Sequence, residues 1–274
     1  MFIGIDIGGT HTRIATGGRG KIKKRADFPT KEFQTSIQEI KEAAENLSQG
    51  ETIKRIGVAV PGPLDMRTGK LLGSPHLVGW NNIEIADIFA NLLKTEAVVG
   101  HDASVAALGE FRFGAGRGKN PMLYITVSTG IGIGLIVGGK IFKGIYNPEA
   151  GHQILGKSGT KCTCGQEADL ETYASGTGIK AASDKEPVDV EGTQVWAEAM
   201  EWLGIGVANM ILHYAPEIVI IGGGMTKHKD LFFPPLEASL KKHLHQIPPV
   251  SIVPSGLGQD SGIIGAITLA EEGY

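Results

Sequence analysis

The sequence predicts an α/β protein of two lobes with mixed, mainly parallel sheets. Short apolar strands alternate with amphipathic helices along the chain, and this alternation is typical of parallel sheets. A strand that runs into glycines occurs near residue 8 and again near residue 130, so the layout repeats and indicates two similar lobes facing each other across a cleft. With 274 residues, the chain is long enough for two lobes of ordinary size.

The first predicted element is an apolar strand over 2–7. Asp6 stands at its carboxyl end, and Gly8, Gly9 and Thr10 follow, so backbone N–H groups and a hydroxyl would cradle an anion there. Because a carboxylate is unfavourable beside such a cradle without a cation, a divalent ion carrying nucleotide phosphates would suit the site. A plain hairpin turn is the alternative, and the two are compatible because a return strand follows.

Helices and strands alternate through the rest of the first half. Ligands of parallel sheets lie beyond the carboxyl ends of the strands, so Asp6, Gly62 and Asp102 should share one site. The predicted elements are a helix over 30–49, a strand over 53–60 that ends in Pro61-Gly62-Pro63, a helix over 83–93 capped by Asn81 or Asn82, a strand over 97–99 and a small-residue helix over 103–111.

The second half begins again with a strand and a glycine run. Residues 142–178 look irregular and are rich in Gly, His, Cys and Glu, which is typical of a functional insertion. The predicted elements are a strand over 122–128, a glycine loop over 129–134, a return strand over 135–137, a helix over 195–214, a strand over 217–221 that enters three glycines, and a small-residue helix over 262–272.

Composition indicates a soluble globular protein and argues against several partners. Hydrophobic residues make up 42% of the chain, and a net charge of −3 offers no basic field for nucleic acid. No stretch approaches the ~20 apolar residues that span a bilayer, and no secretion signal is evident, so we expect a cytoplasmic protein without a membrane partner. Cys162 and Cys164 are too close for an unstrained disulfide, which leaves a metal or nothing.

Five motifs occur in a fixed order over nearly the whole chain. They are Asp6-Ile7-Gly8-Gly9-Thr10, Ser128-Thr129-Gly130-Ile131-Gly132, Glu149-Ala150-Gly151-His152, Cys162-Thr163-Cys164-Gly165 and Ile221-Gly222-Gly223-Gly224. Together they resemble the ROK family of sugar kinases and sugar-responsive repressors. The resemblance implies an actin-like, hexokinase-type ATPase fold, with one lobe formed by 1–108 plus 262–274 and the other by 109–261. It also implies ATP-dependent phosphorylation of a hexose or N-acetylhexosamine, and a homodimer.

The resemblance implies a role for each matching site residue. Asp102 would be the general base that takes the proton of the attacking sugar hydroxyl, whereas a helix N-cap is its alternative role. The implied sugar contacts are Gly62, Ser74, His101, Asp102, Glu149, His152 and Glu171. The implied contacts to the phosphates of ATP and to Mg²⁺ are Asp6, Gly8, Gly9, Thr10, Thr12, Thr129 and Gly130, and those to adenosine are Gly222, Gly223 and Gly224.

The sequence departs from the family pattern in the sugar site and in the second phosphate loop. His101 stands where the family has an asparagine that helps to hold the sugar, so the choice between a neutral hexose and an N-acetylhexosamine stays open. Ser128 and Ile133 replace glycines that are common in the second phosphate loop. We expect the neighbouring glycines to tolerate this change.

A third departure concerns zinc. The family's zinc motif has a further cysteine where this chain has Asp169. Since carboxylate oxygen is an acceptable zinc ligand, His152, Cys162, Cys164 and Asp169 are the predicted ligands of a structural Zn²⁺. The alternative is a loop without metal and with two reduced thiols.

Two other functions are compatible with the same motifs. A ROK-type transcriptional regulator would carry a DNA-binding helix-turn-helix ahead of the first phosphate strand, whereas here Met1 directly precedes that strand. A catalytically silent sugar-binding protein is the other alternative, and the presence of Asp102 argues against it. We therefore expect a kinase.

Overall fold

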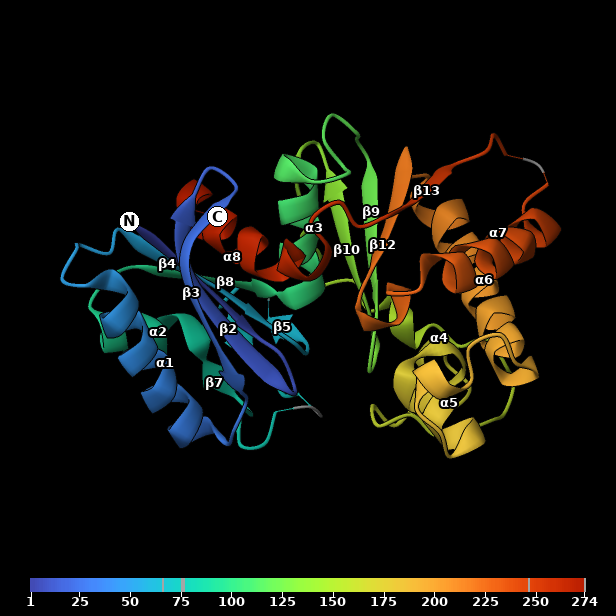
Figure 1. Cartoon of the computed structure of the whole chain (residues 1–274), viewed down its shortest axis with the longest axis horizontal. Coiled ribbons are helices and arrows are strands. Elements are labelled where there is room, and N and C mark those ends of the chain that lie inside the picture. The colour runs from blue at the N-terminus through green and yellow to red at the C-terminus, as the bar shows by residue number, and fades with distance from the viewer. Residues whose placement is uncertain (66, 75–76, 246, 274) are drawn as a thin grey trace.

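The computed structural model describes residues 1–65, 67–74, 77–245 and 247–273, and it has two lobes side by side (Figure 1). The first lobe is built on a five-stranded sheet of order β3-β2-β1-β4-β8. Its strands are β1 (Phe2–Ile7), β2 (His11–Gly18), β3 (Lys21–Pro29), β4 (Arg55–Val60) and β8 (Ala97–His101). The central strand β1 pairs antiparallel with β2 and parallel with β4.

The second lobe repeats this arrangement with the order β11-β10-β9-β12-β13. Its strands are β9 (Met122–Val127), β10 (Ile131–Val137), β11 (Lys140–Ile141), β12 (Ile218–Gly222) and β13 (Ser251–Pro254). Here β9 pairs antiparallel with β10 and parallel with β12, as β1 does with its neighbours. The predicted α/β fold with mixed sheets is confirmed, but the expectation that these sheets are mainly parallel is wrong. In each five-stranded sheet two antiparallel pairings accompany two parallel ones.

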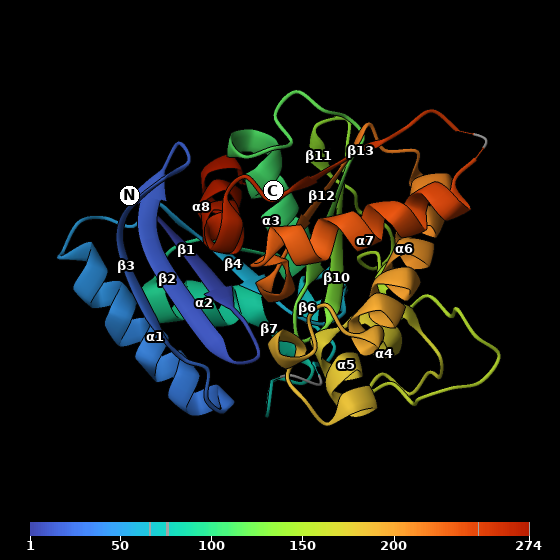
Figure 2. The ribbon, with the colours of Figure 1, turned by 45° about the vertical axis from the view of Figure 1, so that its right-hand side comes forward.

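The helices form layers on both sides of each sheet (Figures 1 and 2). Helices α1 and α2 cover the outer face of the first sheet, and α6 and α7 cover the outer face of the second. Helices α3 and α8 contact each other between the two sheets. The helices are α1 (Phe33–Ser48), α2 (Ile85–Leu93), α3 (Asp102–Phe113), α4 (Leu170–Ala174), α5 (Gly176–Ser183), α6 (Gln194–Tyr214), α7 (Lys229–His243) and α8 (Ser261–Glu272), with short 3₁₀ turns η1 (Ala150–His152), η2 (Pro187–Asp189), η3 (Gly224–Thr226) and η4 (Gly258–Asp260).

The apolar pattern of the sequence explains the core. In β1, Ile3, Ile5 and Ile7 are fully buried, because they share the face of this central strand that packs against α1 and α2. Helix α8 packs on β1 and β4 of the first sheet although it lies at the other end of the chain. Since α3 contacts both sheets, the expected lobe boundaries near 108 and 262 stay a prediction.

Several predicted elements need correction. Helix α2 begins at Ile85, after a short strand β7 (Ile83–Glu84) that joins β5 (Leu64–Asp65) and β6 (Lys70–Leu71) in a small sheet, so neither predicted asparagine caps it. The return strand β10 begins at Ile131, four residues earlier than expected, since most of the glycine run is strand. Helix α7 was not predicted because Pro234 and Pro235, which usually break helices, lie inside it.

Two segments connect the lobes, one between α3 and β9 and one between β13 and α8. Both segments meet at the carboxylate of Glu110 on α3, which is fully buried. Its Oε1 accepts hydrogen bonds from Ser255 Oγ (2.5 Å), Ser261 Oγ (2.8 Å) and Leu257 N–H (2.9 Å), and its Oε2 accepts from Ala115 N–H (2.9 Å) and Gly256 N–H (3.1 Å). One side chain therefore holds both connecting segments.

Among the described helices, none is long and apolar enough to cross a membrane.

Candidate active site

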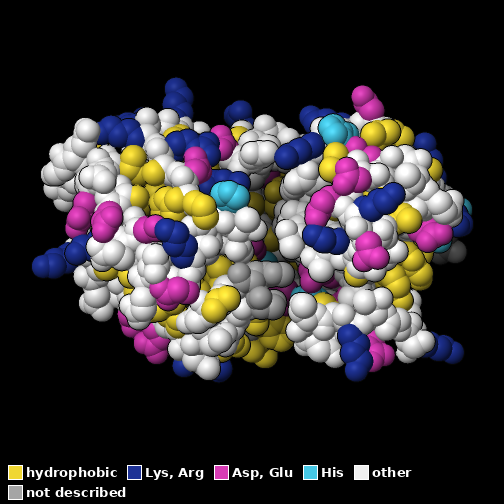
Figure 3. All heavy atoms as spheres, turned by 60° about the horizontal axis from the view of Figure 1, so that its bottom comes forward, with side chains coloured by type: hydrophobic (Ala, Val, Ile, Leu, Met, Phe, Trp, Pro, Cys, Tyr) yellow, Lys and Arg dark blue, Asp and Glu magenta, His cyan; other side chains and the backbone are white. Residues whose placement is uncertain are grey.

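A cavity of about 730 Å³ lies between the lobes, at the edge where the strands of both sheets end. Figure 3 shows the groove between the two halves of the molecule. This volume is in the range of cavities that hold small molecules. It brings together these predicted site residues: Gly8, Gly9, Thr10, Gly62, His101, Asp102, Thr129, Gly130, Glu149, His152 and Glu171.

Asp102 is the first residue of α3 and follows directly on the last residue of β8. Its side chain is one-third exposed toward the cavity, and its Oδ1 accepts the N–H of Ala103 at 2.6 Å. Helix α3 has His101 at its N-cap position, without a side-chain cap. Asp102 is therefore not the N-cap, and the orientation of its carboxylate is fixed by its own helix.

The imidazole of His101 is buried beside this carboxylate. Its Nε2 lies 3.3 Å from Asp102 Oδ1. Its Nδ1 is buried and has no hydrogen-bond partner among the described residues. The ring therefore turns Nε2 toward the carboxylate and leaves Nδ1 unpaired in the interior.

The turn between β1 and β2 forms one wall of the cavity through Gly8, Gly9 and Thr10. Asp6 lies just behind it, with its carboxylate 3.2 Å from the guanidinium of Arg13. Arg13 thus supplies a cation that we had expected from a metal ion. Burial nevertheless raises the pKa of Asp6 to about 6, so the arginine compensates its charge only in part.

Thr12 was predicted to contact phosphate, but the structure places it away from the cavity. Its side chain is fully buried in β2, and its hydroxyl lies 2.9 Å from that of Thr30. Thr10 lies in the turn before β2 and lines the cavity, whereas Thr12 lies within the strand and points into the core. The role of Thr12 here is structural.

The turn between β9 and β10 forms the opposite wall through Thr129 and Gly130. Glu171 on α4 reaches into this turn, where its Oε2 accepts the N–H of Ile131 at 2.8 Å. A Cβ on Gly130 would lie 2.5 Å from that same oxygen, so a larger residue would displace the Glu171 carboxylate from the turn. Ile133 is part of the core of β10, which explains why glycine is not needed at that position.

The loop that follows β4 also lines the cavity, and its backbone conformation at residue 62 requires glycine. Gly62 has a φ of 108°, in the left-handed region that favours glycine. A Cβ added to Gly62 would lie 3.1 Å from the Cβ of Ser74. Ser74 thus lies next to Gly62, but the described cavity lining includes its neighbour Gly73 and not Ser74 itself.

Glu149 and His152 enter the cavity from the short turn η1. Glu149 accepts a 2.5 Å hydrogen bond at Oε1 from the amide of Asn147. Sequence reasoning missed Asn147, and only its position two residues before Glu149 could have pointed to it. With Glu171, these side chains surround a space where hydroxyl groups could be hydrogen-bonded.

The predicted metal ligands form one cluster at the back of Glu171. The ligand atoms of His152, Cys162, Cys164 and Asp169 all lie within 4.8 Å of one another. Nδ1 of His152 lies 2.9 Å from Asp169 Oδ2 and 3.6 Å from Cys162 Sγ, and Cys164 Sγ lies 3.7 Å from Asp169 Oδ2. Two sulfurs, one imidazole and one carboxylate at such separations are compatible with tetrahedral Zn²⁺.

The protonation of the cluster without metal agrees with its geometry. The hydrogen bond with Asp169 raises the pKa of His152 to about 9, and burial raises the pKa of Cys162 to about 12. Burial also acts on Asp169, but hydrogen bonds from His152 and the Thr172 N–H hold its pKa at about 2. A metal ion would therefore displace protons from histidine and thiols when it binds.

A second cavity of about 710 Å³ adjoins the first, and both are lined by Ser128 and Thr129. Of the three glycines predicted to contact adenosine, only Gly224 lines it. A Cβ on Gly222 would lie 2.6 Å from the hydroxyl of Tyr124, and Gly223 packs against the backbone of β9. These two glycines are therefore required for packing.

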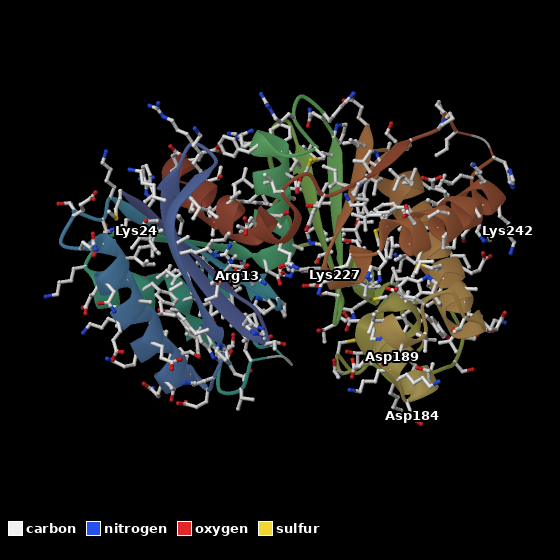
Figure 4. The ribbon with its side chains drawn as sticks, viewed as in Figure 1. Arg13, Lys24, Asp184, Asp189, Lys227 and Lys242 are labelled. Carbon is white, nitrogen blue, oxygen red and sulfur yellow. The ribbon has the colours of Figure 1, made fainter. Side chains whose placement is uncertain are left out.

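Two lysines of the second cavity were not predicted. Lys180 comes from α5 and Lys227 follows η3. Figure 4 labels Arg13 on the first lobe and Lys227 on the second, on either side of the cleft. No sequence motif distinguishes these cations from surface lysines.

Comparisons with known proteins agree with this geometry. The sequence profile of the ROK family matches residues 2–273. Glucokinase of Thermotoga maritima is 29% identical, with 98% of this chain and 97% of that protein covered, and fructokinase of Pediococcus pentosaceus is 27% identical, with 99% and 98% covered. Among solved structures, ROK hexokinase from Thermus thermophilus has a TM-score of 0.89 at 27% identity, covering 99% of this chain and 98% of that one. A ROK family glucokinase from Streptomyces griseus in complex with glucose and AMPPNP has a TM-score of 0.87 at 27% identity, covering 99% of both chains.

Proposed function

The chain belongs to the ROK family, and from that premise we propose that it phosphorylates a neutral hexose or an N-acetylhexosamine with ATP. Its relatives include a glucokinase and a fructokinase, and a structural relative binds glucose and AMPPNP. The chain is accordingly an ATP-dependent sugar kinase. The observation that carries the finer proposal is one cavity that Asp102 lines together with both glycine turns and the side chains of Glu149, His152 and Glu171. A cytoplasmic location and a homodimer stay predictions.

Asp102 would act as the general base. Its carboxylate accepts the proton of the attacking sugar hydroxyl, whose oxygen then forms the bond to the γ-phosphorus while the bond to ADP breaks. The fixed orientation of Asp102 at the start of α3 supports this role. The N-terminus of that helix also carries partial positive charge, which favours an anion nearby.

Glu149, His152 and Glu171 would hold the other hydroxyls of the sugar. Carboxylates accept and imidazole donates or accepts hydrogen bonds, so the three can discriminate between sugars by the positions of their hydroxyls. Among the described residues that line the first cavity, none is a lysine or an arginine. This supports a neutral acceptor over a sugar phosphate.

The two glycine turns would hold the phosphates of ATP. Gly9 with Thr10, and Thr129 with Gly130, would present backbone N–H groups from opposite lobes, whereas the N–H of Gly8 donates to the carbonyl of His11 at 2.9 Å. The charge of buried Asp6, which Arg13 compensates only in part, makes it a suitable partner for Mg²⁺, which when bound would neutralise negative charge on the phosphates. The second cavity, with Gly224 and Lys227, would receive adenosine.

Zinc would be structural in this proposal. The cluster lies beside the sugar-binding side chains, because His152 presents Nδ1 to the ligands and belongs to the cavity lining as well. The metal would thereby fix the position of the imidazole that the sugar contacts.

The test is coupled-enzyme turnover with a panel of hexoses, N-acetylhexosamines and sugar phosphates. We expect at least one neutral sugar to be phosphorylated with saturation in both sugar and ATP. A sugar phosphate that turns over better than every neutral sugar would contradict the proposed acceptor. Absence of turnover with the whole panel, in protein that is folded by circular dichroism, would contradict the proposed function itself.

A further inference from the structure

Asn147 is a buried side chain that connects two walls of the active-site cavity. It is only 1% exposed. Its amide nitrogen donates to Glu149 Oε1 at 2.5 Å, and its amide oxygen accepts the backbone N–H of Leu64 at 3.2 Å. We infer that Asn147 is a positioning residue, which sets the affinity for sugar by fixing the carboxylate of Glu149 against the loop of the opposite wall.

The two hydrogen bonds determine the orientation of the amide. A carboxylate can only accept and a backbone N–H can only donate, so the nitrogen must face Glu149 and the oxygen must face Leu64. Rotating the amide by 180° would break both bonds and leave two acceptors facing each other. Asparagine therefore suits this position better than aspartate, which has no donor when ionised.

Leu64, the partner of Asn147 on the opposite wall, is adjacent in sequence to residues that line the cavity. Leu64 opens β5 directly after Pro61-Gly62-Pro63, and all three of those residues line the cavity. An antiparallel bridge between Asp65 and Tyr146 holds the two segments together next to Asn147. Asn147 thus ties the loop around Gly62 to Glu149, and both surfaces face the proposed sugar.

The consequence for kinetics follows from the proposed function, on which this inference rests. Glu149 would contact hydroxyls that do not react, so its contacts are the same in the ground state and the transition state. Disordering Glu149 should therefore raise the KM and Kd for sugar and leave kcat nearly unchanged. Since neither hydrogen bond of Asn147 reaches the glycine turns or the second cavity, the KM for ATP should not change.

The test is Asn147→Asp, which keeps the size and the acceptor for Leu64 but removes the donor to Glu149. We expect sugar binding weaker by roughly 10- to 100-fold, because the lost bond is to a charged group and two carboxylates then face each other. We expect kcat within about threefold of wild type. Asn120→Asp is the control, since the Asn120 side chain accepts the N–H of Gly139, a carboxylate can accept it equally, and neither residue lines a cavity, so both constants should stay unchanged.

A double-mutant cycle with Glu149→Gln identifies the route of the effect. If Asn147 acts through Glu149, Asn147→Asp should cost little once Glu149→Gln is present. Should the aspartate variant not fold, Asn147→Ala is measured in its place, with the same expected increase in the KM for sugar.

Two results would overturn the inference. One is a KM for sugar within twofold of wild type in the folded Asn147 variant, and the other is an effect of equal size with and without Glu149→Gln. A merely structural role would lower the thermal midpoint and the active fraction without raising the KM for sugar. A wild-type protein that turns over no sugar of the panel would instead contradict the proposed function.

Discussion

Glu110, whose carboxylate accepts hydrogen bonds from both segments that connect the lobes, offers a quantitative test of the structure. Glu110→Gln keeps the length of the side chain and one oxygen. If that oxygen stays at the position of Oε1, the bonds from Ser255, Ser261 and Leu257 survive. The new NH₂ group then faces the N–H groups of Ala115 and Gly256, and two hydrogen bonds become contacts between donors.

The expected loss follows from these two bonds. A hydrogen bond to a charged group contributes about 1.5–3 kcal/mol, so two of them amount to roughly 3–6 kcal/mol. The neutral glutamine offsets part of this loss because it has a smaller desolvation cost than a buried carboxylate. We therefore expect the free energy of unfolding to fall by about 3 kcal/mol, a large share of the roughly 5–15 kcal/mol of a typical domain.

The assay is urea unfolding followed by circular dichroism and by tryptophan fluorescence, with coincidence of the two transitions as the condition for a two-state analysis. Glu45→Gln on α1 is the matched control, since Glu45 is 61% exposed and lies 3.9 Å from Lys41. We expect the control to change stability by less than about 0.5 kcal/mol. A loss below about 1 kcal/mol for Glu110→Gln would refute the reasoning.

Three further predictions concern the active site. Asp102→Asn should lower turnover by roughly 10²–10⁴-fold and weaken sugar binding, measured by titration, far less; near-normal turnover would exclude Asp102 as the base. Burial raises the pKa of Asp6 from 3.8 to about 6, so the folded state favours the protonated carboxyl. The contribution of Asp6 to the free energy of unfolding of the metal-free protein should therefore be largest below pH 4 and fall by roughly 3 kcal/mol as the pH rises through 6. Asp6→Asn should remove that fall, and equal urea midpoint differences between pH 4 and pH 7.5 in both proteins would contradict the pKa. Protein purified without chelator should contain about one zinc per chain, and chelation or Cys164→Ser should weaken sugar binding; absence of zinc with unchanged sugar affinity would favour a loop without metal.

The positions of three proposed site residues could be predicted because they lie at the ends of strands. Asp6, Gly62 and Asp102 each stand where an apolar strand ends, and the structure gathers them at one edge of the first sheet. Periodicity and motif spacing were sufficient for that inference. They could not reveal Asn147, whose role depends on a partner 83 residues away along the chain.

Glycine was the least reliable signal, since packing and ligand contact require it equally. Gly132 and Gly134 were expected in a phosphate loop but lie in β10, where Gly134 allows the backbone of α3 to approach. Gly222 and Gly223 likewise serve the packing of β12 against its neighbours. The sequence shows that a side chain is absent at such positions, but it does not show whether a ligand or another part of the protein occupies the space.

The position of α8 has a consequence for how the chain folds during its synthesis. The first sheet is made early, but α8, which buries Ile263 and Ile267 against it, begins about 200 residues after β4 ends. At about 5–20 residues per second, a ribosome needs roughly 10–40 s to cover that distance. Every strand of the second sheet emerges within that interval, from β9 to β13. The lobe that is translated first is therefore the last to be completed. The face of its sheet that α8 covers stays exposed to solvent until α8 leaves the exit tunnel.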